Sequence, residues 1–154
     1  MKKNYEHKES RGIKMSCLLN LGKLIELAEK QYPKNKFIHA TRVATYAMEK
    51  AMMRRDVDPI EAYAVGIAHD LLEDTKCTQS DLFAIMDKKL VYDVVRLTKA
   101  EGTPYEEYIE SIVKYGSPLA ILVKSADMKD HMTQTGTLTN KLKEKYLPNL
   151  KYFL

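Results

Sequence analysis

Four ionisable side chains stand close together in the segment EAYAVGIAHDLLEDT, namely His69, Asp70, Glu73 and Asp74. The first part of this segment is apolar on nearly every side, which predicts a helix that runs through the protein core. At about 100° per residue, His69 and Glu73 would fall on one line of that helix. Asp70 and Asp74 would form a parallel line beside it. Unpaired charge is costly to bury, and a bound cation would remove that cost. The alternative is that the helix end has reached solvent, where an acidic cluster costs little.

Two further residues of the same chemical types are expected to point into the core from other helices. His39 shares a helical face with Val43 and Ala47, although a lone inward histidine is more often a core residue than a ligand. Asp127 follows the most apolar run of the chain, and a core-facing aspartate needs a partner. Two imidazoles and two carboxylates on three helices would suit one divalent ion. Because the set holds no thiolate, we expect Mn²⁺ or Fe²⁺, with Zn²⁺ and Co²⁺ as further candidates.

The order His39, His69-Asp70 and Asp127 resembles the H…HD…D signature of the HD-domain phosphohydrolases. More narrowly, HDLLEDT is similar to the HDxxEDT motif of the alarmone hydrolases, the bacterial enzymes that degrade (p)ppGpp, and of their small stand-alone relatives. KSADMKDHM stands where that family has a lysine-x-Ala-Asp segment ending in Asn-Met. The stretches GTPYEEYIESI and LTNKLKEKYLPNL are also similar to small stand-alone HD proteins. The resemblance covers residues 20–154.

The resemblance implies that two histidines and two aspartates bind one Mn²⁺, namely His39, His69, Asp70 and Asp127. The ion would lower the pKa of a water molecule and polarise a phosphoryl oxygen. Glu73 and Asp74 would be the catalytic carboxylates, which orient that water or move its proton. Basic residues near these positions would bind the substrate phosphates, and the candidates are Lys36, Arg42 and Lys124. For Arg42, a surface salt bridge is the alternative.

Position 131 departs from the family pattern. The family has asparagine four residues after the late aspartate, where it contacts the nucleotide, and this chain has His131. His131 lies one helical turn beyond Asp127, so it would face the same pocket. We expect it to contact substrate or to serve as an extra metal ligand, and a partly exposed histidine without either role is the alternative.

These residues support three hypotheses about function. The first is a metal-dependent phosphohydrolase that acts on a nucleotide as a (p)ppGpp-type 3′-pyrophosphohydrolase. The second, suggested by His131, is an HD phosphomonoesterase that acts on nucleoside monophosphates or another small phosphate. The third is a non-catalytic HD domain that binds a nucleotide or a protein. Since we expect no synthetase domain in the chain, an alarmone enzyme of this kind would only degrade.

The elements expected to position these residues are almost all helical. Apolar periodicity and helix-start signals predict helices over 17–31, 36–54, 59–73, 79–86, 88–99, 104–115, 118–133 and 139–153. Asp58, Thr103 and Ser117 each precede a proline and are predicted N-caps, the first two with an acid that completes a capping box; Thr78 is a weaker one. We expect a flexible tail over 1–14 and one domain over 15–154. The predicted architecture is an all-α, HD-type orthogonal bundle of about seven to eight helices.

Composition limits the remaining classes of function. The chain has 154 residues, a net charge of +4 and two cysteines, Cys17 and Cys77, which give no disulfide framework. No apolar run is long enough for a membrane span, and the N-terminus has no secretory signal. The basic residues are scattered, so nucleic-acid binding is not expected. We therefore expect a cytoplasmic protein whose partner is a small nucleotide, and the sequence indicates no oligomeric state.

Overall fold

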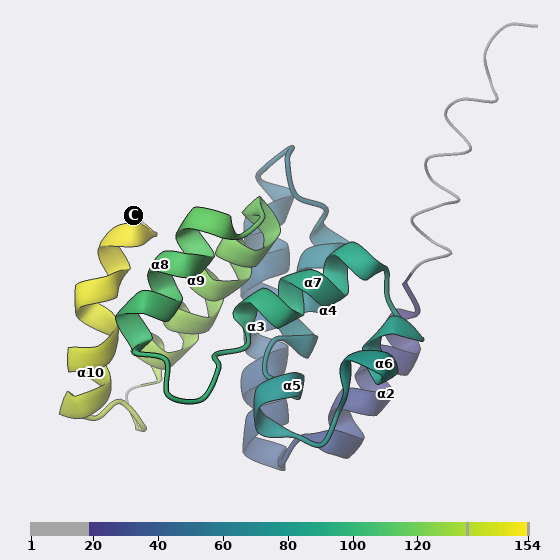
Figure 1. Ribbon diagram of the computed structural model, residues 1–154, viewed down its shortest axis with the longest axis horizontal. Coiled ribbons are helices and arrows are strands. Elements are labelled where there is room, and N and C mark those ends of the chain that lie inside the picture. The colour runs from purple at the N-terminus through teal and green to yellow at the C-terminus, as the bar shows by residue number, and fades with distance from the viewer. Residues whose placement is uncertain (1–18, 135, 154) are drawn as a thin grey trace, which may run out of the picture.

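The computed structural model describes residues 19–134 and 136–153, which form a bundle of helices (Figure 1). The helices are α2 (Leu21–Gln31), α3 (Lys34–Met52), α4 (Pro59–Ala68), α5 (Leu71–Asp74), α6 (Gln79–Phe83), α7 (Lys88–Leu97), α8 (Tyr105–Tyr115), α9 (Pro118–Thr133) and α10 (Asn140–Tyr146), followed by a 3₁₀ helix, η1 (Leu147–Tyr152). One isolated bridge pairs Leu19 with Met86. The all-α bundle predicted from the sequence is confirmed.

The centre of the bundle is the pair α3 and α4, which pack closely through small side chains. Ala40, Ala44 and Ala47 of α3 are fully buried. Gly66 of α4 lies directly against Ala44, since a Cβ atom on Gly66 would come within 2.6 Å of the Ala44 Cα. α9 packs against both helices. The three segments that carry the predicted metal ligands therefore meet in the middle of the molecule.

The C-terminal helices lie beside the end of α9. Figure 1 shows α8, α9 and α10 gathered at one end of the molecule, with α2 and α6 at the other. Tyr146 of α10 is buried, and the Tyr152 hydroxyl of η1 donates a hydrogen bond of 3.0 Å to Glu110 Oε1 of α8. The hydrogen bond holds the C-terminal segment against α8, and Tyr146 stacks on His131 in the part of α9 that follows Asp127.

Several predicted helix starts are confirmed. Asp58 and Ser117 accept hydrogen bonds from backbone N–H groups of the first turns of α4 and α9. The capping box predicted at Asp58 is wrong, because the Glu61 carboxylate pairs with Lys89 instead of with the Asp58 N–H. The start at Thr78 is more complete than predicted, because Thr78 and Asp81 form a reciprocal capping box. The cap predicted at Thr103 is wrong. The residue at the cap position of α8 is the following proline, whose backbone is extended, with ψ of 140°.

Other predicted boundaries differ from the structure. The helix predicted over 59–73 is two segments, α4 and α5. The predicted helices over 79–86 and 88–99 end earlier, at Phe83 and Leu97. The segment predicted as one helix over 139–153 changes to a 3₁₀ helix at Leu147, directly before a proline that lacks the N–H an α-helix needs.

A tyrosine side chain separates α4 from α5. The Tyr32 hydroxyl donates to the Ile67 carbonyl at 2.9 Å and accepts from the Asp70 N–H at 3.2 Å. His69 Nδ1 lies 2.7 Å from the Gly66 carbonyl, which would accept from the Asp70 N–H in an unbroken helix. Groups that insert into the backbone ladder in this way kink or break a helix. At the break, the Tyr32 hydroxyl holds the Asp70 backbone and the Gly66 carbonyl holds the His69 ring.

Some predictions fall outside the described residues, namely the tail over 1–14 and Cys17. The first helix, predicted over 17–31, begins later, at Leu21, where the Asn20 side chain caps it. Cys77 is a buried free cysteine, and burial raises its pKa to about 11. Within 19–134 and 136–153, no helix combines the length and the apolar character that crossing a membrane requires.

Candidate metal centre

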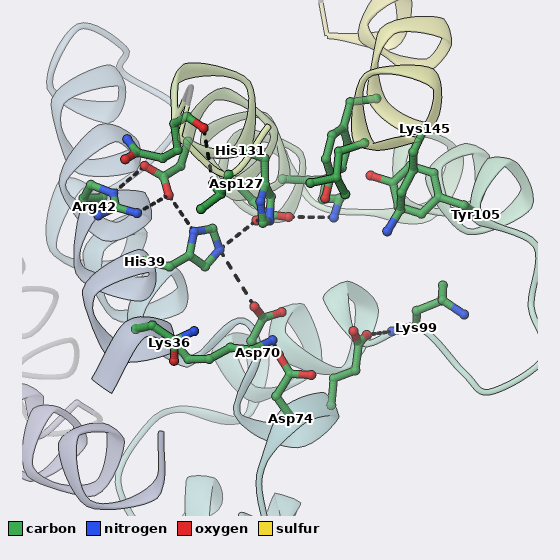
Figure 2. Close-up of a pocket in the computed structure, with 18 of the residues that line it drawn as sticks. Lys36, His39, Arg42, Asp70, Asp74, Lys99, Tyr105, Asp127, His131 and Lys145 are labelled. Carbon is green, nitrogen blue, oxygen red and sulfur yellow. Dashed lines mark hydrogen bonds and ion pairs between the residues drawn. The ribbon is translucent and has the colours of Figure 1, made fainter. Parts of the chain in front are cut away.

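The four predicted metal ligands lie together at the junction of α3, α9 and the turn after α4. The Asp127 Oδ1 atom is 3.0 Å from His39 Nε2 and 3.5 Å from His69 Nε2. The Asp70 Oδ2 atom is 3.2 Å from His69 Nε2 and 3.9 Å from His39 Nε2. Figure 2 shows His39 between Asp70 and Asp127. Both histidines and Asp127 are buried, and Asp70 is partly buried. Glu73 and Asp74 are exposed, so the alternative of an acidic helix end in solvent holds for these two residues and not for the histidines and Asp127.

His69 has an unsatisfied nitrogen that points into this cluster. Its Nδ1 faces the Gly66 carbonyl, which only accepts hydrogen bonds, so Nδ1 carries a proton. In the neutral imidazole, Nε2 then holds a free lone pair. This Nε2 atom is buried and has no hydrogen-bond partner of good geometry, although two carboxylate oxygens lie within 3.5 Å. A cation among these atoms would satisfy the nitrogen and the carboxylates together.

The donor atoms are spaced closely enough for a divalent ion in two overlapping groups, His39 with His69 and Asp70, and His39 with Asp127 and His131. Metal–ligand distances of about 2.0–2.2 Å place neighbouring ligand atoms about 3 Å apart and opposite ones about 4.2 Å apart. The four imidazole–carboxylate distances above fall between 3.0 and 3.9 Å. The donors are imidazole nitrogens and carboxylate oxygens, which suit Mn²⁺ and Fe²⁺ and also admit Zn²⁺ and Co²⁺.

A buried carboxylate holds His39 in the same tautomer as His69, with the proton on Nδ1. The His39 Nδ1 donates to Asp130 Oδ2 at 2.6 Å, which leaves Nε2 turned toward Asp127. Arg42 donates to both oxygens of Asp130, at 2.7 and 3.1 Å. A carboxylate on the outer nitrogen of a metal-binding histidine orients the ring and strengthens the ligand. Arg42, predicted to bind substrate, lines the cavity but is paired with Asp130 here.

Asp130 is absent from the residues predicted above, and the sequence carried a signal for it. It lies three residues after Asp127 on α9, so the two carboxylates share a helical face. Its side chain is 1% exposed. Two features of the sequence predict its role. Asp130 lies one helical turn from the predicted ligand Asp127, and Arg42 lies one turn from the predicted ligand His39.

Lys124, also predicted to bind substrate, lines the cavity and holds Asp127 in place. Its Nζ donates to Asp127 Oδ2 at 2.7 Å, so that the other oxygen faces the imidazoles. Burial opposes the charged forms of both side chains. Even so, the Asp127 carboxylate raises the pKa of Lys124, and Lys124 holds the pKa of Asp127 well below its usual range. Lys124 also lies 5.0 Å from the centre of the Tyr108 ring.

The two predicted catalytic carboxylates lie beside the cluster, and each is anchored through one oxygen. Glu73 Oε1 accepts from the Lys99 backbone N–H at 2.6 Å, and burial raises the pKa of Glu73. Asp74 Oδ2 accepts from Lys36 Nζ at 2.8 Å, so Lys36, predicted to bind substrate, is paired with Asp74 here. Both carboxylates keep a second oxygen outside these bonds.

A cavity of about 630 Å³ opens on the cluster. All four predicted substrate-binding residues line it, namely Lys36, Arg42, Lys124 and His131. Its far wall holds residues that the sequence did not single out, namely Lys99, Tyr105, Tyr108, Lys145 and Tyr146. Figure 2 shows Lys99, Tyr105 and Lys145 on the side of the cluster away from Arg42. Binding sites for small molecules have volumes of roughly 300–1,000 Å³.

No model of a known protein family matches the chain, and no curated protein is similar to it in sequence.

Proposed function

We propose that this chain is a metal-dependent phosphohydrolase of the HD type that acts on a nucleotide, with (p)ppGpp and its 3′-pyrophosphate as the leading substrate. The observation that carries the proposal is the unpartnered, buried Nε2 of His69, which faces the Asp70 and Asp127 carboxylates. Such a group is costly unless a cation or a proton completes it, and the two carboxylates beside it favour either one. The motif HDLLEDT, with the late Asp127, supports the class of reaction and the substrate.

Glu73 and Asp74 are the groups proposed to act on the attacking water. A bound divalent ion would supply the Lewis acid for this reaction. Burial raises the pKa of Glu73, so its carboxylate is a stronger base than an exposed one and takes up a proton more readily. The Lys99 N–H and the Lys36 ammonium each hold one carboxylate, which limits the positions of the free oxygens. Holding the base in one place is itself a large part of catalysis.

The cavity supports a phosphorylated substrate larger than a single phosphate. Five basic side chains line it, namely Lys36, Arg42, Lys99, Lys124 and Lys145. Three of them are paired with carboxylates, on Asp74, Asp130 and Asp127. Lys145 instead lies 4.5 Å from the centre of the Tyr105 ring. Cations beside aromatic rings on the wall away from the metal ligands suit a ligand that carries both phosphates and a base.

The test is a metal-supplemented hydrolysis assay on the purified chain. With Mn²⁺, ppGpp and water should give GDP and pyrophosphate. Glu73→Gln should keep metal binding and lose about 10²–10⁴-fold in turnover, whereas Asp70→Ala should lose both. Glu61→Gln is the matched control, because Glu61 is paired with Lys89 away from this cavity, and turnover should be unchanged.

Three outcomes would contradict parts of the proposal. No pyrophosphate from ppGpp with Mn²⁺, Fe²⁺, Zn²⁺ or Co²⁺ would refute the substrate. Inorganic phosphate released from nucleoside monophosphates would replace it with the phosphomonoesterase hypothesis. A nucleotide that binds the metal-loaded protein and is never cleaved would indicate a non-catalytic binding domain. The cytoplasmic location and the absence of nucleic-acid and membrane partners stay predictions.

A further inference from the structure

Three imidazoles, rather than two, face the same oxygen of Asp127. Besides His39 Nε2 at 3.0 Å and His69 Nε2 at 3.5 Å, His131 Nε2 lies 3.3 Å from Asp127 Oδ1. One potential ligand atom from each of His39, Asp127 and His131 lies within 4.8 Å of the others. The third imidazole therefore joins the candidate metal site from the Asp127 side, while His39 and His69 lie near both Asp70 and Asp127.

Neighbouring rings hold His131 in this orientation. Its ring is tilted against His39, with centroids 4.6 Å apart, and stacks on Tyr146 of α10, with centroids 5.1 Å apart and planes 13° apart. The His131 side chain is 35% exposed, so its outer edge reaches the cavity while Nε2 faces inward. A side chain that bound only substrate would turn its donor toward the open cavity instead of toward a buried carboxylate oxygen.

We propose that His131 is a fifth protein ligand of the divalent ion, so that three imidazoles and two carboxylates hold it. This proposal rests on the metal centre of the proposed function. One position of an octahedral shell would remain for water or a substrate oxygen. The site would also favour different metals from a site with two imidazoles. Imidazole suits Fe²⁺, Co²⁺ and Zn²⁺, whereas carboxylate and water suit Mn²⁺. His131 should therefore raise the affinity for Co²⁺ more than the affinity for Mn²⁺.

The experiment compares the metal-depleted chain with two variants in titrations with Co²⁺ and Mn²⁺. His131→Asn removes the imidazole, and His131→Phe keeps a ring for the stack on Tyr146 but has no nitrogen. Loss of an outer-shell partner lowers metal affinity about 10–100-fold, so loss of a ligand should lower Co²⁺ affinity at least 10-fold, with a smaller loss for Mn²⁺. The visible absorption of the Co²⁺ protein should change in both variants, because its intensity and position follow the coordination shell.

Unchanged Co²⁺ affinity and an unchanged spectrum in both variants would overturn the proposal. A measurement on the unmodified chain gives a second, independent answer if the variants fold poorly. Pulsed electron paramagnetic resonance of the Mn²⁺ protein should show three coordinated imidazoles, and two would overturn the proposal. If wild-type protein binds no divalent ion, the metal centre itself is wrong. If binding depends on His131 but no phosphate compound is cleaved, His131 stands as a ligand and the hydrolase function fails.

Discussion

Replacing Asp130 by asparagine tests whether the histidine tautomers make this cluster a metal site. Asp130 is buried and uses both oxygens, with Oδ2 accepting from His39 Nδ1 at 2.6 Å and both oxygens accepting from Arg42. Asparagine has nearly the same shape but one oxygen and one NH₂ group. Whichever way the amide is turned, an N–H group faces a donor that the carboxylate had satisfied.

The two orientations have different consequences for the metal site. With NH₂ toward His39, Nδ1 must accept, so the proton moves to Nε2 and this nitrogen cannot bind a cation. With NH₂ toward Arg42, the histidine keeps its tautomer and loses a charged acceptor. We expect metal affinity to fall about 10–100-fold, which corresponds to about 1.4–2.7 kcal/mol. The free energy of unfolding of the metal-free protein should fall by about 1–3 kcal/mol, because a buried donor loses its partner.

Calorimetric titration with Mn²⁺ and urea unfolding measure these two effects on the same samples. Asp56→Asn is a matched control, since Asp56 accepts from Arg54 through the same two-bond arrangement, at 2.9 and 2.7 Å, on the exposed surface. Exposed ion pairs contribute little, so the control should bind metal normally. Normal metal affinity in Asp130→Asn, with a folded protein, would refute the reasoning that Asp130 sets the tautomer of His39.

Three further predictions concern the frame of the site. Tyr32→Phe removes the hydroxyl between α4 and α5. The free energy of unfolding should fall by about 1–3 kcal/mol, because the buried Ile67 carbonyl and the partly buried Asp70 N–H lose a partner. Urea unfolding checks this, and wild-type stability would contradict it. Gly66→Ala places a methyl group against Ala44, at 2.6 Å from its Cα, and should lower the unfolding temperature, whereas an unchanged value would show that α3 and α4 move apart freely. In the metal-free protein, burial lowers the pKa values of His39 and His69, but the nearby carboxylates raise them by more. The folded state then binds more protons than the unfolded state above about pH 6.5, so the free energy of unfolding should fall as pH rises from about 6.5. A rise in the free energy of unfolding over that range would contradict this.

The helices and the inward direction of the ligands could be predicted because both follow from local patterns. His39 and Asp127 stand on apolar helical faces, and the structure buries both. Asp58 and Ser117 precede prolines at helix starts, and both cap their helices. In each case the deciding neighbours lie within one or two turns of the residue, where periodicity and capping rules apply.

The break after α4 could not be predicted in this way, because its cause lies far away in the chain. Tyr32 is 38 residues before Asp70, and nothing in EAYAVGIAHDLLEDT shows that a hydroxyl will replace a backbone partner there. The same holds for the support of His39, whose partner Asp130 is 91 residues further on. Residue types and helical faces therefore indicate which side chains meet, while the hydrogen bonds that orient them depend on the packing of the whole bundle.

These distant hydrogen bonds decide what the cluster can do. Histidines and aspartates that meet in a core can form buried ion pairs, in which each protonated ring satisfies a carboxylate and no cation is needed. Here His39 and His69 each direct Nδ1 to an acceptor outside the cluster, the Asp130 carboxylate and the Gly66 carbonyl. Both therefore direct Nε2 toward the same pair of carboxylates, and the Nε2 of His69 has no hydrogen-bond partner. This orientation suits a bound cation among the two Nε2 atoms and the carboxylates. In the metal-free protein the same orientation suits protonated rings, which agrees with the raised pKa values of His39 and His69.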